Sequence, residues 1–392
     1  MGKKINPCFS SYSRLRSCGR ERMKHGKVFI AATRQNDGKT TVSLGLIHAF
    51  KKRFRGVGFI KPVGQRYIID HGYKVDEDSV LIEKVCGLRA RIKDMSPIAI
   101  ERGFTEQYIK KGIPEKLMRD IQNSFNRVSK NKELVVIEGT GHAGVGAVFD
   151  LSNAKVARLL GAKVVLVTSG GIGRPIDEIE LNRALFEKEG VEVIGVIVNK
   201  VLPGKYDKIK RVIKLGFKKK NMDVLGVMPY APILAMPRIH NILEETDIDL
   251  ISKKVGMRNK VQNILVGAME PHDALDYIES GTLLITPGDR EDMLMTLLSA
   301  YLLQKPGENI SISGIILTGG IVPNRKIMTL IENAKIPILL SRQHTYKTAS
   351  QIHDLAVKMN PEDRDKVKAA AGLVEDFVDI DAILKKISND GG

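Results

Sequence analysis

One stretch, residues 27–49, most constrains what this chain can fold into. An apolar run over residues 28–32 predicts a buried strand, and the polar loop after it ends in the residues GKTT at positions 38–41. Apolar residues then recur with the spacing of a helix. In a strand, loop and helix of this kind, backbone N–H groups and the positive end of the helix face a polyphosphate. The stretch therefore predicts a phosphate-binding loop.

Each polar residue of this loop has an expected role. Lys39 would reach the β- and γ-phosphates, and Thr40 would place its hydroxyl on Mg²⁺. The standard pattern G-x-x-x-x-G-K-[ST] begins with glycine, whereas this chain has Thr33 there. An ordinary glycine turn with a solvated lysine is the alternative interpretation, which the flanking strand and helix disfavour. The loop residues expected to bind a nucleotide are Thr33, Asp37, Gly38, Lys39, Thr40 and Thr41.

Composition sets the broad class of the protein. With 392 residues, of which 43% are hydrophobic, the chain can bury a normal core and divide into about two domains. No apolar run approaches the roughly 20 residues of a membrane-spanning helix, so no membrane association is expected. The cysteines Cys8, Cys18 and Cys86 lie far apart and include no C-x-x-C pair. This cysteine usage fits the reducing cytoplasm.

The net charge of +17 comes largely from two stretches. Residues 1–26 carry seven basic residues against one acidic, and residues 205–220 carry eight against one. Neither stretch interleaves aromatic residues with its basic ones, as a platform for single-stranded nucleic acid would. We therefore expect a disordered basic tail over residues 1–26 and a solvated helix face over 205–220, with nucleic-acid binding the least favoured option.

Polar residues close several of the expected strands. Lys61 follows the strand over 57–60, and a lysine at the carboxyl end of a strand in an open α/β sheet points toward the ligand crevice. Glu138 closes the apolar strand over 134–137, where an acid without a partner is costly. It is expected to contact Mg²⁺. The alternative is a plain glycine loop at this strand end.

Two further polar residues are candidates for the same site. Asp78 ends an acidic cluster before a helix that is expected to begin at Ser79, and it would either cap that helix or hold Mg²⁺. Asn199 follows the strand expected over 191–198 and is placed to hydrogen-bond the edge of a base.

Alternation of short apolar strands with helices predicts an α/β fold over residues 27–245, with a mostly parallel sheet covered by helices on both faces. Residues 246–261 are expected to form a linker, residues 262–360 a smaller α/β domain, and residues 361–392 a helical extension. In the smaller domain, polar and glycine-rich loops follow the expected strands. These loops form either a shared ligand surface or plain turns, and they contain Asp289, Arg290, Thr318, Gly319 and Gly320.

With these motifs in this order, residues 27–245 resemble dethiobiotin synthetase and its ATP-dependent P-loop relatives. The resemblance implies ATP and Mg²⁺ as cofactors. It implies that Lys39 and Thr40 hold ATP and the metal, and that Lys61 contacts phosphate and substrate. It also implies that Asp78 and Glu138 are the metal carboxylates and that Asn199 contacts adenine.

The second half resembles the DRTGG domain, a regulatory module, through PGDR at 287–290 and LTGG at 317–320. This pairing of domains resembles the regulatory front of long bacterial phosphotransacetylases. It implies a regulatory role for Asp289, Arg290 and residues 318–320.

Two departures from these families narrow the expected activity. The sequence ends at Gly392 without the phosphotransacetylase catalytic domain, so acetyl transfer is not expected. Residues 141–149 do not reproduce the substrate loop of dethiobiotin synthetases. Cobyrinic acid diamide synthases share the front half but also need a glutaminase domain, and no cysteine for its nucleophile lies beyond Cys86.

Three functions remain open from the sequence. The first is a regulatory protein that binds ATP with Mg²⁺ and acts on its own oligomer or on a regulated enzyme partner. The second is an ATP-dependent ligase, related to dethiobiotin synthetase or cobyrinic acid diamide synthase, that activates a carboxylate or carbamate as an acyl phosphate. There Lys39 and Lys61 would be the catalytic residues. The third is binding of nucleic acid or an acidic partner through residues 205–220.

Overall fold

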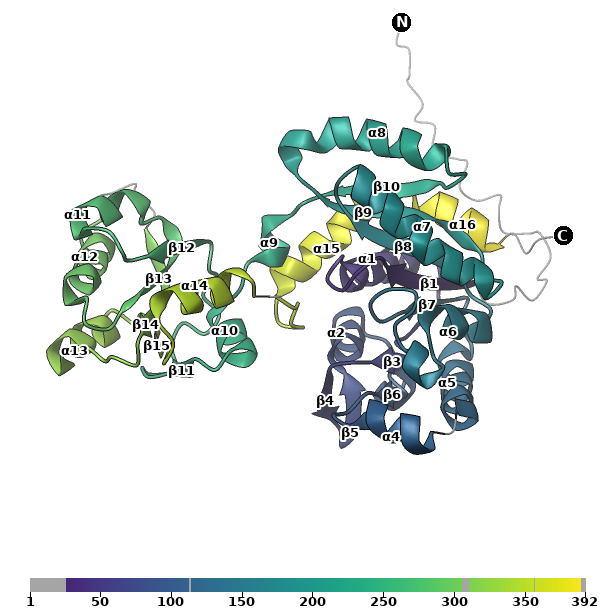
Figure 1. Cartoon of the computed structure of the whole chain (residues 1–392), viewed down its shortest axis with the longest axis horizontal. Coiled ribbons are helices and arrows are strands. Elements are labelled where there is room, and N and C mark those ends of the chain that lie inside the picture. The colour runs from purple at the N-terminus through teal and green to yellow at the C-terminus, as the bar shows by residue number, and fades with distance from the viewer. Residues whose placement is uncertain (1–25, 113, 305–309, 356, 389–392) are drawn as a thin grey trace, which may run out of the picture. The chain divides into compact units, whose positions relative to one another are not determined.

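The computed structural model describes residues 26–112, 114–304, 310–355 and 357–388, and these divide into two compact units. The first unit contains the described residues up to Tyr230 together with those from Ala370 onward, and the second contains Ala231–Ala369. Figure 1 labels the elements of both units. The expected tail lies outside the described residues, except for Gly26, which begins the first strand.

The first unit is built on a parallel sheet of six strands in the order β10-β9-β8-β1-β7-β2 (Figure 1). Every residue of β7 and the last five of β1 are buried, which shows that helices cover both faces of the sheet. The α/β class and the mostly parallel sheet are therefore confirmed. The strands are β1 (Gly26–Ala32), β2 (Val57–Ile60), β7 (Leu134–Glu138), β8 (Lys163–Ser169), β9 (Val193–Val201) and β10 (Val224–Pro229).

The main helices of this unit are α1 (Lys39–Lys51), α2 (Glu77–Cys86), α4 (Phe104–Lys111), α5 (Pro114–Ser129), α6 (Asn153–Leu160), α7 (Gly173–Lys188) and α8 (Tyr206–Lys218). Two small sheets lie beside them, formed by β3 (Val63–Gly64) with β6 (Ile98–Ala99) and by the hairpin of β4 (Tyr67–Asp70) with β5 (Tyr73–Asp76). The short helix α3 (Ile92–Met95) follows α2.

The end of the chain packs into the first unit rather than forming a separate extension. Its helices are α15 (Arg364–Phe377) and α16 (Ile380–Ser388), and the boundary between the units falls within α15. Val374 is fully buried against α1, where a Cβ on Gly45 would overlap its side chain. The apolar side of these helices therefore completes the core of a domain that begins more than 300 residues earlier.

The second unit contains a sheet in the order β11-β15-β14-β13-β12, parallel except for β11. Leu284 belongs to one hydrophobic cluster and Leu283 and Ile285 to another, so alternate side chains of β13 fill cores on both faces of the sheet. The strands are β11 (Asp249–Leu250), β12 (Asn263–Val266), β13 (Ser280–Pro287), β14 (Ser311–Thr318) and β15 (Ile338–Leu340). The helices are α9 (Pro232–Ala235), α10 (Ile239–Glu245), α11 (Pro271–Ala274), α12 (Glu291–Leu302), α13 (Arg325–Asn333) and α14 (Thr345–His353).

Residues 246–261, expected to be a linker, instead belong to the body of the second unit. They include β11, in which Leu250 pairs with Leu339 of β15, and the side chains of Ile248 and Val261 are buried. A two-residue edge strand has too few residues to show the alternation from which strands are recognised, which explains the difference. No helix in the described part of the chain is long and apolar enough to cross a membrane.

Candidate functional site

The expected phosphate loop lies at the carboxyl edge of the first sheet. It follows β1, which lies between β7 and β8 and pairs with both in parallel. Ile30 is level with Glu138 on one side, and Ala32 is level with Val167 on the other. Because parallel strands end at one edge, the residues that follow these three strands meet there, which is where open α/β sheets bind ligands.

The loop is held together by the carboxylate of Asp37. Thr33 Oγ1 donates to Asp37 Oδ2 over 2.8 Å, and the backbone N–H of Arg34 donates to the same oxygen over 2.8 Å. Ser169 Oγ, at the end of β8, donates to Asp37 Oδ1 over 2.5 Å. Burial raises the pKa of Asp37. The threonine that replaces the usual first glycine thus contributes a hydroxyl that shapes the loop.

Asn199 lies against the backbone of the same loop. Its Nδ2 donates to the carbonyl oxygen of Asp37 over 2.9 Å, and its Oδ1 accepts from the N–H of Lys200 over 2.8 Å. Gly38 has a φ of 102°, and a Cβ there would overlap Asn199 Nδ2. Asn199, which was expected to contact adenine, thus holds the turn that leads into α1.

Lys39 is the first residue of α1, and its side chain is buried with 8% exposed. Burial lowers the pKa of this lysine. Its hydrogen bond to the carbonyl oxygen of Arg34 is long, at 3.4 Å, and it forms no ion pair with any residue in the described ranges. Glu138, Asp37 and Asp78 attract its charge from a distance, but their effect does not outweigh burial. A buried ammonium without a direct ion pair is unfavourable, so this geometry favours an anion beside the loop.

Lys61, by contrast, lies among three carboxylates. Its Nζ is 2.9 Å from Asp76 Oδ1 and 3.5 Å from Glu138 Oε1, and it also donates directly to Asp78 Oδ2. Burial opposes the charged form of Lys61, but Asp78, Asp76 and Glu138 together outweigh it and hold the pKa of the lysine well above its usual value. The structure thus brings together Lys61 and both carboxylates that were expected to hold the metal.

Asp76 is the member of this cluster that the sequence analysis did not select. It is 2% exposed, and its Oδ1 accepts the N–H of Asp78 over 3.0 Å, so it is the N-cap of α2. The helix begins at Glu77, two residues before the expected start at Ser79. With the helix expected to begin at Ser79, the cap position fell on Asp78, so the sequence held no separate signal for Asp76.

Glu138 and Thr40 provide the oxygen atoms that a hard cation prefers. Thr40 Oγ1 donates to Glu138 Oε1 over 3.0 Å, and burial raises the pKa of Glu138, which is fully buried. Its other oxygen, Oε2, is buried and accepts no hydrogen bond from the residues described. These features fit Mg²⁺, whose ligands are carboxylates, hydroxyls, phosphates and water. No group of three or more His, Cys, Asp or Glu in the described segments is arranged to hold a metal alone, so phosphate and water would complete the shell.

The five residues selected in the second half also come together, at one edge of the second sheet. Pro287 of β13 is level with Thr318 of β14, so Asp289 and Arg290 follow one strand beside the loop that follows the other. Gly319 and Gly320 have φ values of 76° and 69°, which favour glycine. Their N–H groups donate to the carbonyls of Gln343 and Ser341, while Arg290 binds Asp292 and the carbonyl of Met269.

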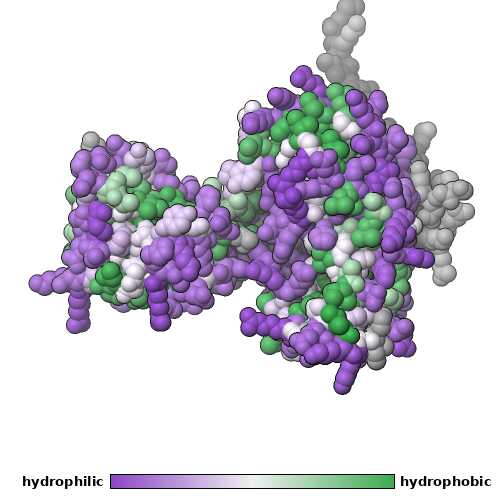
Figure 2. Space-filling model, in the orientation of Figure 1, coloured by the Kyte–Doolittle hydropathy of each residue, from purple (hydrophilic) through white to green (hydrophobic). Residues whose placement is uncertain are grey.

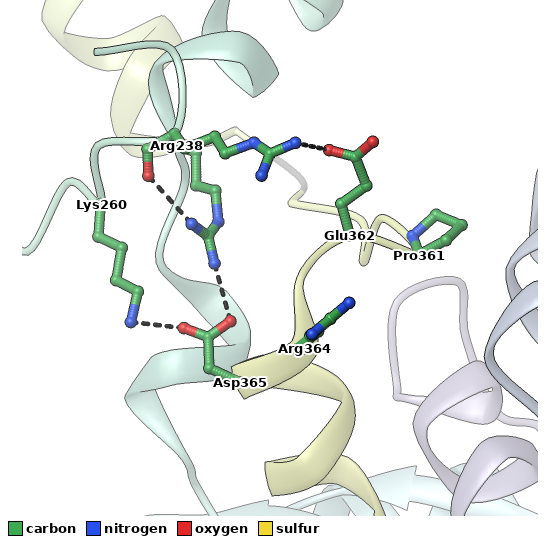
Figure 3. Close-up of a pocket in the computed structure, with 7 residues that line it drawn as sticks. Arg238, Lys260, Pro361, Glu362, Arg364 and Asp365 are labelled. Atoms are coloured by element: carbon green, nitrogen blue, oxygen red, sulfur yellow. Dashed lines mark hydrogen bonds and ion pairs between the residues drawn. The ribbon is translucent and has the colours of Figure 1, made fainter.

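A pocket of about 690 Å³ also lies in the second unit. The residues that line it are distant in the sequence from the strand ends described above. Figure 3 shows that several of its charged side chains pair with one another. Arg238 Nη2 donates to Asp365 over 2.8 Å, Lys260 pairs with the same carboxylate over 2.5 Å, and Arg258 binds Glu362. The network connects the start of α15 and the residues before it to the start of α10. None of the residues selected from the sequence lines this pocket.

Asp76→Ala should destabilise the first unit by about 2 to 4 kcal/mol, because it removes both a helix cap and one partner of the buried Lys61. The measurement is thermal or denaturant unfolding followed by circular dichroism. Asp381→Ala is the matched control, since Asp381 pairs with Arg53 at the surface and an exposed pair contributes less than about 1 kcal/mol. Equal losses in the two variants would contradict the role given to Asp76.

Comparison with known proteins divides the chain close to Tyr230, where the first of the two compact units ends its N-terminal segment. Residues 26–238 match the family described as the AAA domain, and residues 241–355 match the DRTGG domain. A phosphate acetyltransferase of Nitratidesulfovibrio vulgaris is 26% identical over 371 residues, which cover 92% of this chain and 52% of the relative. One from Nitrosomonas europaea is 24% identical, over 91% of this chain and 51% of the relative. The chain thus spans about half the length of these relatives, and the expected pairing of domains is confirmed.

Similar solved structures each cover about half of the chain, with low TM-scores. The septum site-determining protein MinD from Pyrococcus horikoshii, complexed with Mg-ADP, has a TM-score of 0.34 and 20% identity and covers 54% of this chain and 84% of its own. The CBS and DRTGG domains from the regulatory region of Clostridium perfringens pyrophosphatase have a TM-score of 0.26 and 18% identity. They cover 45% of this chain and 86% of their own.

Proposed function

The chain belongs to the AAA domain family through residues 26–238, and from this premise we propose that its first unit binds ATP with Mg²⁺ and that the DRTGG domain makes this binding regulatory. The observation that carries the proposal is the buried ammonium of Lys39, which lies at the expected phosphate loop and forms no ion pair with the residues described. A polyphosphate would supply that charge, and the N–H groups of the loop and the start of α1 would bind its oxygens.

The other polar residues of the site have roles that follow from their positions. Mg²⁺ bound with ATP neutralises charge on the phosphates. Thr40, Asp78 and Glu138 would hold the metal, and Glu138 offers the buried oxygen without a hydrogen bond. Lys61 balances the charge of the carboxylates in the structure, and it would be able to contact a phosphate or acceptor if a bound metal took over that charge. Asp37 and Asn199 keep the loop in shape.

Asp78→Asn and Glu138→Gln should weaken ATP binding at least about tenfold with Mg²⁺ present and much less in EDTA, because the carboxylates act through the metal. Calorimetric titration of each variant with ATP under both conditions is the test. Glu187→Gln, an exposed change on α7 in the same unit, is the control and should bind as the wild type does. Equal losses with and without Mg²⁺ would remove the metal role from both residues.

Regulation implies that a change in the DRTGG domain alters ATP binding, because coupling between two sites is reciprocal. Arg290→Ala should shift ATP affinity, or the dependence of self-association on ATP, by an amount typical of such coupling, roughly 5- to 150-fold. The variant removes a guanidinium that binds Asp292 and Met269 in the second unit. Titration and sedimentation at zero and saturating ATP measure the two effects. Lys326→Ala, at an exposed position of the same unit, is the control.

An ATP-dependent ligase is the second candidate, and the buried cluster around Lys61 favours it. A purely structural site would not need a lysine and three carboxylates buried together beside a phosphate loop. In this role Lys61 would orient an acceptor carboxylate or carbamate, and Lys39 would neutralise the transferring phosphoryl group. Release of phosphate from ATP, assayed with and without small dicarboxylates and diamines, separates the two functions. Steady turnover would place the ligase first, and binding without turnover supports regulation.

A further inference from the structure

The segment from Lys205 to Lys220 contains α8, whose two sides differ completely. Ile209, Ile213 and Phe217 recur at helical spacing and are buried, and α8 packs against β10 at the edge of the sheet (Figure 1). The opposite side is exposed and basic. Its basic residues, with those that flank the helix, are Lys205, Lys208, Lys210, Arg211, Lys214, Lys218, Lys219 and Lys220.

None of these eight side chains forms an ion pair with a residue that the structure describes. Acidic residues are present on the neighbouring α7, but Glu180 and Glu187 pair with Arg183 of their own helix. Asp207 is the single acid within the basic segment. The positive charge of this surface is therefore not neutralised by the protein, unlike that of Lys61 or Arg238.

The geometry of the charges suits a regular polyanion. Lys210, Lys214 and Lys218 are four residues apart, so they lie in a row along one side of α8. At a rise of about 1.5 Å per residue, consecutive members of the row are about 6 Å apart along the axis. Repeated cations on a rigid helix match the repeated phosphates of a nucleic-acid backbone, and binding releases the counter-ions condensed on it.

Other classes of partner fit this surface less well. A helix that binds a membrane surface buries its apolar side in the lipid, but here that side is occupied by the protein core. The centres of protein interfaces are rich in aromatic residues and poor in lysine, whereas the exposed apolar residue on this side of α8 is Leu215. Figure 2 shows a hydrophobic area in the region of α8, bordered by hydrophilic residues. No aromatic side chain is exposed on the described helix to stack on single-stranded bases.

We propose that the basic side of α8, with the lysines that flank it, binds the backbone of double-stranded nucleic acid without regard to sequence. The surface uses no residue of the phosphate loop, so the proposal does not rest on ATP binding. It would bring the protein to nucleic acid through charge alone, with an affinity that falls steeply as salt rises.

The test uses the full chain and a short fluorescent DNA duplex, with binding followed by anisotropy between about 50 and about 200 mM salt. The variant carries Lys210→Gln, Lys214→Gln and Lys218→Gln, and glutamine is chosen because it favours helix as lysine does. The control carries Lys253→Gln, Lys254→Gln and Lys326→Gln at exposed positions of the second unit, and so has the same net charge. Melting temperatures check that both variants are folded.

We expect the α8 variant to bind the duplex about tenfold more weakly at the lower salt concentration. In a plot of log affinity against log salt concentration, the slope of this variant should be smaller in magnitude by about 2 to 3. This is roughly one for each phosphate that the variant no longer neutralises. The control should keep the wild-type affinity and slope. Absence of duplex binding by the wild type, or equal losses in the two variants, would overturn the proposal. Binding to anionic lipid vesicles through the same lysines, without binding to the duplex, would assign the surface to membranes and overturn it as well.

Discussion

Lys39→Ala is expected to weaken ATP binding at least about 100-fold while leaving the fold intact. The lysine is buried beside the phosphate loop, burial lowers its pKa, and no carboxylate in the described residues pairs with it. Its charge therefore contributes little to the protein alone and much to a bound polyphosphate. Removing a buried charge that lacks a partner should leave the melting temperature unchanged or raise it. Calorimetric titration with ATP and Mg²⁺, together with thermal unfolding, measures both effects.

Lys130→Ala is the control for this variant, because Lys130 is an exposed lysine of the same unit and should bind ATP normally after substitution. In the wild type, ATP affinity should also fall as pH rises through the lowered pKa of Lys39. The sign follows because the neutral amine attracts phosphate less, while bound phosphate favours the protonated form. Unchanged affinity in Lys39→Ala would reject the assignment of the phosphate loop.

Gly38→Ala should destabilise the first unit by about 2 to 5 kcal/mol and abolish ATP binding. Two costs add: a left-handed backbone at an alanine, about 1 to 2 kcal/mol, and overlap of the new Cβ with Asn199 Nδ2, about 1 to 3 kcal/mol. Denaturant unfolding followed by circular dichroism gives the first effect, and calorimetry with ATP gives the second. Gly87→Ala is the matched control, because Gly87 has a φ of 58° and no described atom within 4 Å of a Cβ there.

A double-mutant cycle separates these two costs. In an Asn199→Ala background the overlap is absent, so Gly38→Ala should cost only the backbone term, as Gly87→Ala does. The difference between backgrounds measures how closely Asn199 encloses the turn. If Gly38→Ala costs the same in both backgrounds, Asn199 does not hold the loop as its hydrogen bond to Asp37 indicates.

The sheet and the phosphate loop were predictable because both produce strong local patterns. Apolar runs predicted β1 and β7. Because these strands are parallel neighbours, the loop that follows β1 and Glu138 at the end of β7 lie at the same edge of the sheet. Lys61 was selected for the same reason, and it lies 3.5 Å from Glu138. In each case the backbone pattern alone places the side chain at the carboxyl edge.

The parts that were missed depend on contacts between residues far apart in the sequence. Nothing local distinguishes Asp76 from Asp78, because both lie at the start of one helix and only the position of Lys61 shows that both face the cluster. The role of Asn199 in the loop depends on the positive φ of Gly38, over 160 residues earlier. The packing of Val374 against Gly45 of α1 likewise could not be predicted from the sequence. An amphipathic pattern shows which side of a helix is buried but not which element covers it.

The central claim is that the loop recognises the phosphates of a nucleotide, and comparison of ATP with AMP tests it most directly. Both ligands carry the same base and sugar, but only ATP has the β- and γ-phosphates that Lys39 and Thr40 are proposed to contact. Calorimetric titration of the wild type with Mg²⁺ present should give one ATP site per chain and no measurable AMP binding at the same concentrations. Equal affinity for the two nucleotides, or no binding of ATP, would contradict the account.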